Sequence, residues 1–361
     1  MAPSMRRPLR LIAINLAVLA AFLVVGLSIA EVTARVARGR PLLLWMNFTE
    51  ANLDFQRLVQ PGRYDALLGW APREDYVSST NYWGIQIRTG KHGLRSTGEP
   101  QSSEPAPAIL VVGDSFTFGD EVSDQESWPF ILNGLIEEHV LNGGVFGYGI
   151  DQSYLRLTQL VKHYHPERIV FGFIAEDIAR AQWSRRFGEK PFFSVRGDQV
   201  ELRNVPVPRL PPEAIDLGLL AKILGHSFFL DGIVRRTSLV GYLYPEGHFK
   251  AKFEHNDGDT VACWIMDQLA VISSTGVEVS VLAQYTHEEL GHATMPAAVS
   301  QVLTCARERG LRVIDLFSPL KEVGPARLKT FFNLEMSGHM SAAGNGFVAQ
   351  QMAGHLRPRT Q

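Results

Sequence analysis

A serine and a histidine near opposite ends of the chain are the residues best suited to act together. Ser115 follows Gly113 and Asp114, directly after the apolar run 109–112. The run predicts a buried strand that ends at the Gly-Asp-Ser turn. Because a serine hydroxyl is a weak nucleophile unless a neighbouring base takes its proton, a base is needed. His339, ahead of an expected C-terminal helix, is the candidate base.

The elements that must position these two residues alternate between strands and helices. Strands are expected at Ile109–Val112, Val140–Val145, Arg168–Ile174, Val277–Ala283 and Leu311–Leu316. Helices are expected at Trp128–His139, at Gln152–Tyr164 and after His339. This alternation predicts a parallel sheet with helices on both faces. Ligands of such sheets bind beyond the carboxyl ends of the strands, where Ser115 lies.

The Gly-Asp-Ser block and the late Gly338-His339 block resemble the SGNH (GDSL) hydrolase family, in particular its membrane-anchored members of bacterial envelopes. The resemblance implies a three-layer flavodoxin-like fold, with Ser115 as nucleophile and His339 as general base. It also implies a serine esterase or acyltransferase. The substrate would be a small acyl, acetyl-like ester of an envelope carbohydrate or lipid, and no cofactor is expected.

The resemblance also assigns the oxyanion hole, and here the chain departs from the family. The backbone N–H of Ser115 and that of Gly147, in the glycine-rich block 142–149, are the expected donors. The family's third donor is an asparagine side chain, whose place Glu176 takes. An ionised carboxylate accepts hydrogen bonds but cannot donate one. Glu176 is therefore either protonated or turned elsewhere, with backbone donors forming the hole.

A second departure concerns the acid that orients the histidine. The family often places it two or three residues before the histidine, where this chain has Ser337 and Met336. Glu335, one residue further back, is a candidate replacement, and Asp315 is a weaker one. The alternative is a Ser-His dyad oriented by a backbone carbonyl. Both departures keep open a degenerate domain that binds a glycan or protein partner without catalysis.

Composition excludes several classes of function. The 361 residues carry a formal net charge of −2, which gives no field to attract nucleic acid. Asp114 has no partners at metal-ligand spacing, so no metal site is expected. Cys263 and Cys305 match no metal spacing either. Two buried thiols are the favoured interpretation, and a disulfide in an oxidising compartment is the alternative.

The N-terminal run 11–30 is almost wholly apolar and long enough to span a bilayer. It exceeds the apolar stretch of about 7–15 residues usual in a signal peptide, so an uncleaved anchor is favoured. Arginines flank both ends, so the positive-inside rule gives only a slight preference for a cytoplasmic N-terminus. The resemblance to membrane-anchored members implies a catalytic domain that is extracytoplasmic, periplasmic or at the cell surface. We expect a cytoplasmic tail and anchor at 1–35 and a lead-in and linker at 36–107. The hydrolase-like domain follows at 108–361, with an inserted subdomain at about 182–259.

Overall fold

The structure is a computed structural model. It describes residues 6–37, 42–43, 62–78, 85–98, 108–186, 188–197, 199–209, 218–234, 250–252 and 257–356. Much of the expected lead-in and linker lies outside these residues. The chain divides into two compact units, which are treated separately below. One comprises Met1–Leu53 with Ile215–Pro245, and the other comprises Asp54–Ala214 with Glu246–Gln361.

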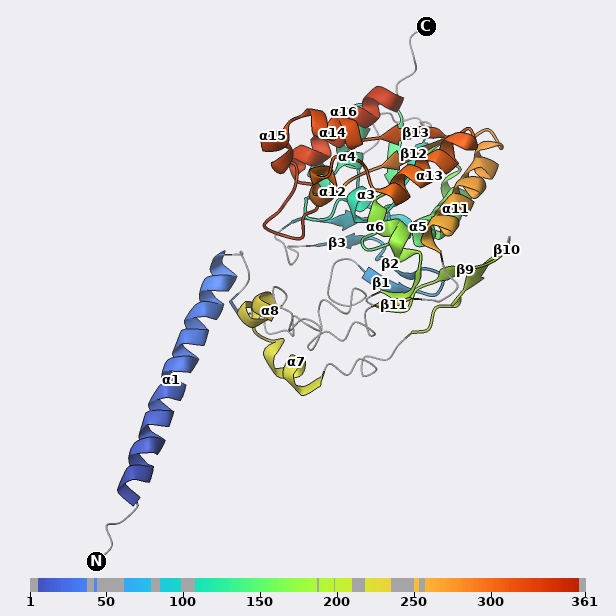
Figure 1. Cartoon of the computed structure of the whole chain (residues 1–361). Helices are drawn as coiled ribbons and strands as arrows, with labels where there is room; N and C mark the ends of the chain where they lie inside the picture. Colours follow the sequence, from blue (N-terminus) through green and yellow to red (C-terminus); the bar gives the residue numbers. More distant parts are fainter. Residues whose placement is uncertain are drawn as a thin grey trace, which may run out of the picture. The chain divides into compact units, whose positions relative to one another are not determined.

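A parallel sheet of five strands is the centre of the second unit (Figure 1). Its strands, in spatial order, are β13 (Arg312–Asp315), β12 (Glu278–Ala283), β7 (Arg168–Phe173), β5 (Ala108–Val112) and β6 (His139–Asn142). Every neighbouring pair is parallel. The strand order reverses between β5 and β7, which is where ligands bind in folds of this kind. The predicted parallel, flavodoxin-like fold is confirmed.

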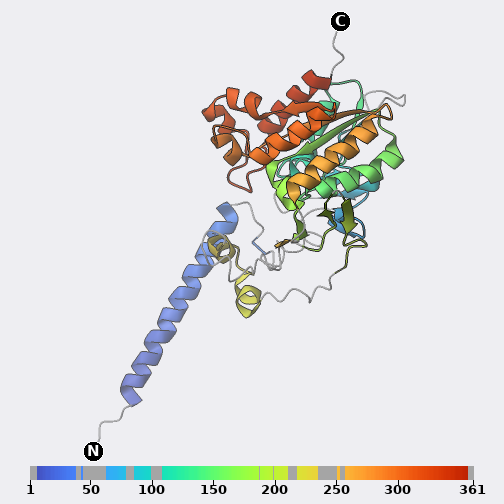
Figure 2. The same cartoon turned by 45° about the vertical axis from the view of Figure 1, so that its right-hand side comes forward.

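Helices cover the sheet on both faces, giving three layers (Figure 2). On one face α11 (Gly258–Ser273) packs against α5 (Ile150–Tyr164) and α13 (Ala297–Glu308), and on the other α16 (Ala342–Leu356) packs against α4 (Trp128–Asn133). The shorter helical elements are α3 (Ser115–Phe118), η2 (Asp124–Glu126), α6 (Ala175–Arg180), α12 (His287–Gly291), α14 (Phe317–Glu322) and α15 (Pro325–Lys329).

Two predicted boundaries were wrong, and glycines explain both. The helix that starts at Trp128 ends at Asn133, where Gly134 forms its C-cap, rather than at His139. The strand expected at Val140–Val145 ends at Asn142. Gly143 and Gly144 follow it and pass so close to β5 and α3 that a Cβ would meet them.

Short antiparallel pairs of strands also belong to the second unit, some ahead of β5 in the sequence and others after β7. They are β1 (Gly62–Asp65) with β2 (Gly69–Pro72), β3 (Tyr76–Val77) with β4 (Arg88–Thr89), β8 (Trp183–Arg186) with β11 (Lys250–Lys252), and β9 (Phe192–Arg196) with β10 (Gln199–Arg203); η1 (Lys91–Gly93) follows β4. Trp70 of β2 is buried and donates from Nε1 to the carbonyl of Phe146, at 3.0 Å. The lead-in therefore supports the loop that carries Gly147.

The first unit contains the membrane-span candidate. Helix α1 (Arg6–Ala37) is apolar and long enough over Leu11–Ala37 to cross a bilayer. The inserted segment contributes α7 (Gly218–Leu224) and α8 (Phe228–Val234), of which α8 packs against α1.

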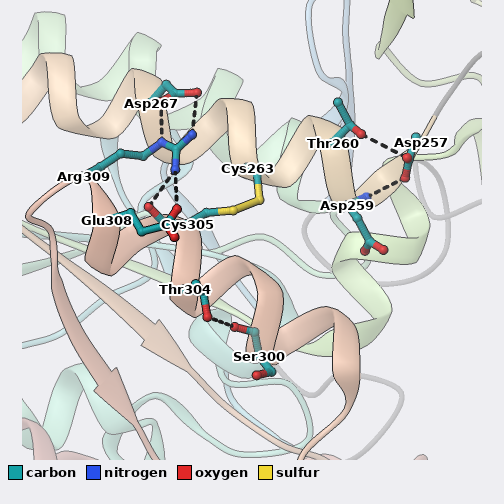
Figure 3. Close-up of a disulfide and its surroundings, with 10 residues drawn as sticks. All are labelled: Asp257, Asp259, Thr260, Cys263, Asp267, Ser300, Thr304, Cys305, Glu308 and Arg309. Atoms are coloured by element: carbon teal, nitrogen blue, oxygen red, sulfur yellow. Dashed lines mark hydrogen bonds and ion pairs between the residues drawn. A yellow bond between two sulfur atoms is a disulfide. The ribbon is translucent and has the colours of Figure 1, made fainter.

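The two cysteines form a disulfide, which corrects the favoured interpretation of two buried thiols. Cys263 of α11 and Cys305 of α13 have Cα atoms 5.5 Å apart and are bonded through their sulfurs (Figure 3). Both side chains are only half-buried. The pairing follows from the packing of α11 on α13, which brings together residues 42 positions apart.

We expect the disulfide to stabilise the fold by about 4 kcal/mol, the loop-closure entropy of a closed loop of 42 residues. Urea unfolding of the full chain in detergent, followed by tryptophan fluorescence, should show this loss of unfolding free energy in the Cys263→Ser, Cys305→Ser double variant. Dithiothreitol should lower the wild-type midpoint similarly and leave the variant unchanged. Equal midpoints for both proteins would contradict the pairing.

Candidate active site

The loop after β5 places Ser115 at the carboxyl edge of the sheet. Asp114 caps α3 by accepting a hydrogen bond from the N–H of Phe116 through Oδ1, at 2.9 Å. This cap fixes Ser115 at the first position of the short helix. The Ser115 hydroxyl lies 2.9 Å from Nε2 of His339, although the two residues are 224 positions apart. The structure thus brings the predicted nucleophile and base into hydrogen-bond contact.

A tight turn before α16 holds His339 in this position. Its carbonyl accepts from the N–H of Asn333 at 2.8 Å, and the N–H of Gly338 donates to the Asn333 carbonyl at 3.2 Å. Gly338 has φ 85°, a conformation that suits glycine. The Phe116 ring lies against the imidazole, with centroids 5.5 Å apart. Backbone and ring contacts together restrict the orientation of the imidazole.

The carboxylate on the other ring nitrogen is Glu121, not Glu335. Oε1 of Glu121 lies 2.9 Å from Nδ1 of His339 and also accepts from the N–H of Ser337, at 2.8 Å. The Glu121 side chain is 2% exposed, whereas Glu335 is exposed. Ser115, His339 and Glu121 therefore form a hydrogen-bonded series in triad order.

Glu121 was missed because we sought the acid close to the histidine in sequence. It belongs instead to the loop that follows the serine, directly after Gly119 and Asp120. The available signal was this acidic pair, five and six residues beyond Ser115. Glu121 has φ 66°, so its loop adopts an unusual left-handed conformation to aim the carboxylate at the histidine.

A second carboxylate lies near the base. Oδ2 of Asp120 is 4.0 Å from Nε2 of His339. Burial raises the pKa of Asp120 to about 6, although the charge of His339 opposes the rise. Burial also lowers the pKa of His339, but the Glu121 hydrogen bond and the negative charges of Asp120, Glu121 and Asp114 outweigh it. The net result is a raised imidazole pKa.

Gly147 lines the same cavity as Ser115. Its φ is 72°, which glycine adopts without strain. The loop is fixed on one side by Trp70 through the Phe146 carbonyl and on the other by Arg186, which donates to the Gly147 carbonyl at 3.4 Å. The structure thus places both backbone positions predicted for the oxyanion hole at one cavity.

Glu176 faces cations. Its carboxylate lies 2.9 Å from Nη2 of Arg180 and 3.2 Å from Nη2 of Arg186. Guanidinium groups only donate hydrogen bonds, so the Glu176 oxygens that face them act as acceptors. Of the two alternatives for this position, the geometry supports the one in which Glu176 points elsewhere and backbone donors form the hole.

Arg180 connects Glu176 to Asp114, the residue before Ser115. Its Nη1 donates to Asp177 at 2.7 Å and to the Tyr148 carbonyl at 2.8 Å, and lies 3.6 Å from Oδ2 of Asp114. Burial raises the pKa of Asp114, and the positive charge of Arg180 acts against that rise. Arg180 thus joins the serine turn to the glycine loop.

The cavity above Ser115 has a volume of about 460 Å³. Three large apolar side chains line it: Phe116, Ile174 and Leu334. The rest of the lining is mostly charged and polar: Ser115, Asp120, Gly147, Glu176, Arg180, Arg186, Thr286, His287, Glu288, Ser337, Gly338 and His339. Among the residues that the structure describes, no group of histidine, cysteine and acidic side chains is arranged to hold a metal ion.

Comparison with known proteins gives the following likenesses. No family model matches the chain. Over 81 residues it is 30% identical to an arylesterase from Vibrio mimicus; these residues are 21% of this chain and 40% of that protein. Similar solved structures include a G-D-S-L family lipolytic protein from Veillonella parvula (14% identity, TM-score 0.41, covering 70% of this chain and 100% of the other).

Two further structures are similar at comparable levels. A lipase/acylhydrolase from Enterococcus faecalis is 16% identical, with a TM-score of 0.37 and coverage of 71% of this chain and 100% of the other. An acetylxylan esterase from Geobacillus stearothermophilus is 12% identical, with a TM-score of 0.38 and coverage of 71% and 97%. The residues that resemble the SGNH (GDSL) hydrolases are the Gly-Asp-Ser block and the late Gly338-His339 block.

Proposed function

We propose that this chain is a membrane-anchored serine esterase or acyltransferase of the SGNH type, acting on small acyl esters of an envelope carbohydrate or lipid. The observation that carries the proposal is the hydrogen-bonded series Ser115, His339 and Glu121, with ring-nitrogen distances of 2.9 Å on both sides. This is the arrangement in which a base activates a serine and an acid orients the base.

The proposed reaction proceeds through an acyl-serine. Oγ of Ser115 attacks the ester carbonyl carbon while Nε2 of His339 takes the hydroxyl proton. Glu121 accepts from Nδ1–H and balances the imidazolium charge. The N–H groups of Ser115 and Gly147 stabilise the oxyanion. The leaving alcohol takes the proton from His339. Water or an acceptor hydroxyl, deprotonated by the same base, then attacks the acyl carbon, the bond to Oγ of Ser115 breaks, and Oγ takes that proton back from His339.

The cavity supports a small acyl group on a polar carrier. Its lining presents Glu176, Arg180, Arg186 and Glu288 around the serine, with room of about 460 Å³. Such groups suit the hydroxyls of a sugar better than a long acyl chain. The full chain in detergent should therefore hydrolyse an aryl acetate at least tenfold faster than the aryl decanoate. A folded protein that turns over neither ester, but binds glycans, would establish the degenerate binding domain instead.

Replacement of Glu176 tests whether this side chain contributes to the oxyanion hole. With backbone donors forming the hole, Glu176→Ala should change kcat for an aryl acetate less than about tenfold. A donor lost from the hole would cost about 10²–10³. Glu288→Ala, which alters another carboxylate of the same cavity, is the matched control. A selective loss in Glu176→Ala would show that the carboxyl acts as a protonated donor.

Two observations support the proposed location of the domain. Leu11–Ala37 is long and apolar enough to span a bilayer. The Cys263–Cys305 disulfide is typical of an oxidising compartment, which supports an exported catalytic domain.

We expect the chain to stay in the membrane fraction through carbonate and high-salt washes, because neither weakens hydrophobic insertion. A reporter active only outside the cytoplasm, fused after Gln361, should be active. Activity of a cytoplasm-only reporter at that position would overturn the export, and a soluble species starting near Glu31 would show a cleaved signal peptide.

A further inference from the structure

Helix α7 exposes large aliphatic side chains that a soluble surface would not retain. Leu219, Leu220 and Ile223 are 73%, 64% and 61% exposed. They are three of the seven residues of the helix. Ile233 of the neighbouring helix α8 adds a fourth aliphatic side chain, 41% exposed. Clustered exposed apolar groups of this kind mark contact with a partner or a membrane.

Helix α8 is bound to α1 at Glu31, the first charged residue after the apolar run 11–30. The carboxylate of Glu31 accepts hydrogen bonds from the hydroxyl of Ser227 at 2.6 Å and from the N–H groups of Phe228 and Phe229, each at 2.9 Å. Glu31 thereby satisfies the free N–H groups at the start of α8. Figure 1 shows α8 beside the carboxyl-terminal end of α1.

The same carboxylate binds Arg35 of α1. Nε of Arg35 lies 2.6 Å from Oε1 of Glu31, and the Arg35 side chain is 6% exposed. Glu31 directly follows the apolar run 11–30, so this polar cluster marks the level at which the span leaves the hydrocarbon. Carboxylate and guanidinium groups avoid the bilayer centre. With α1 spanning the membrane as proposed, this cluster and the start of α8 would therefore lie near the membrane surface.

We propose that α7 lies in the membrane–water interface, with Leu219, Leu220 and Ile223 inserted among the lipids. α7 ends three residues before Ser227, whose hydroxyl donates to Glu31, so this short connection keeps α7 close to the start of α8. Apolar side chains on a helix at this depth enter the acyl boundary, while the polar face stays in water. The inference rests on the proposed membrane anchoring of α1.

Lipid quenching tests this position. The native cysteines are paired with each other, so a single introduced cysteine can be labelled selectively without reducing agent. We would place an environment-sensitive fluorophore on Ile223→Cys in the full chain, reconstituted in phosphatidylcholine–phosphatidylglycerol vesicles that contain nitroxide-labelled lipid. Two matched sites serve as references: Leu19→Cys, 65% exposed in the span, and Val271→Cys, 62% exposed on α11.

The expected result is quenching at position 223 several-fold above that at position 271 and comparable with that at position 19. Quenching at position 19 alone would overturn the interfacial position while leaving the anchor in place. Absence of quenching at both positions 19 and 223 would overturn the anchor and the interface together. A label at position 223 that is unquenched, but shifts to the blue as the protein-to-lipid ratio rises, would assign this face to a second copy and equally overturn the proposal.

Discussion

Replacement of Ser115 by alanine should abolish labelling by a fluorophosphonate and lower aryl acetate turnover by a factor on the order of 10⁴ or more. The Ser115 hydroxyl lies 2.9 Å from Nε2 of His339 and forms the acyl bond in the proposed reaction. Removal of either partner disables the nucleophile–base unit, so His339→Ala should lose a similar factor. The double variant should be no worse than the worse single one, because the two residues act together.

Two comparisons make this test specific. Ser274→Ala removes an exposed serine whose hydroxyl bonds only within its own helix end, and should leave labelling and turnover unchanged. Thermal unfolding of each variant shows whether a loss reflects misfolding. Full labelling of Ser115→Ala protein would refute Ser115 as the nucleophile.

The sheet was predictable because its signals are local. The alternation of strands with helices predicts the parallel sheet. The apolar run before Gly113 predicts β5, which occupies the expected residues up to one position. The nucleophile and the base were predicted from their positions, because Ser115 comes shortly after a strand and His339 shortly before a helix. Glycines that turn the chain within a pattern, such as Gly134 and Gly143, moved the element ends by several residues.

What the sequence did not show depends on contacts between distant segments. Glu121 reaches His339 across 218 positions, and no periodic pattern records that contact. The cysteines meet only because α11 packs on α13. Likewise, the docking of α8 on Glu31 depends on hydrogen bonds between residues about 197 positions apart.

The acid of the proposed triad is tested by Glu121→Gln. An amide in this place can donate to Nδ1 and so stabilise the tautomer that carries its proton on Nε2. That tautomer cannot take the proton of Ser115, so turnover should fall by up to about 10⁴, as in serine-protease triads. Glu335→Gln is the matched control, since Glu335 is exposed and Glu121 already occupies Nδ1.

The pH profile separates this role from a merely structural one. The pKa of His339 is raised above its ordinary value of 6.5, because the Glu121 hydrogen bond and nearby carboxylates outweigh the effect of burial. Only neutral imidazole is a base, so kcat/KM should be full above the raised pKa and fall as pH drops through it. Loss of the Glu121 charge should move this acidic limb to lower pH while the plateau falls. If the pH profile of Glu121→Gln is unchanged and Glu335→Gln loses most of its turnover, Glu335 is the orienting acid instead. If neither variant loses turnover, the site is a Ser-His dyad.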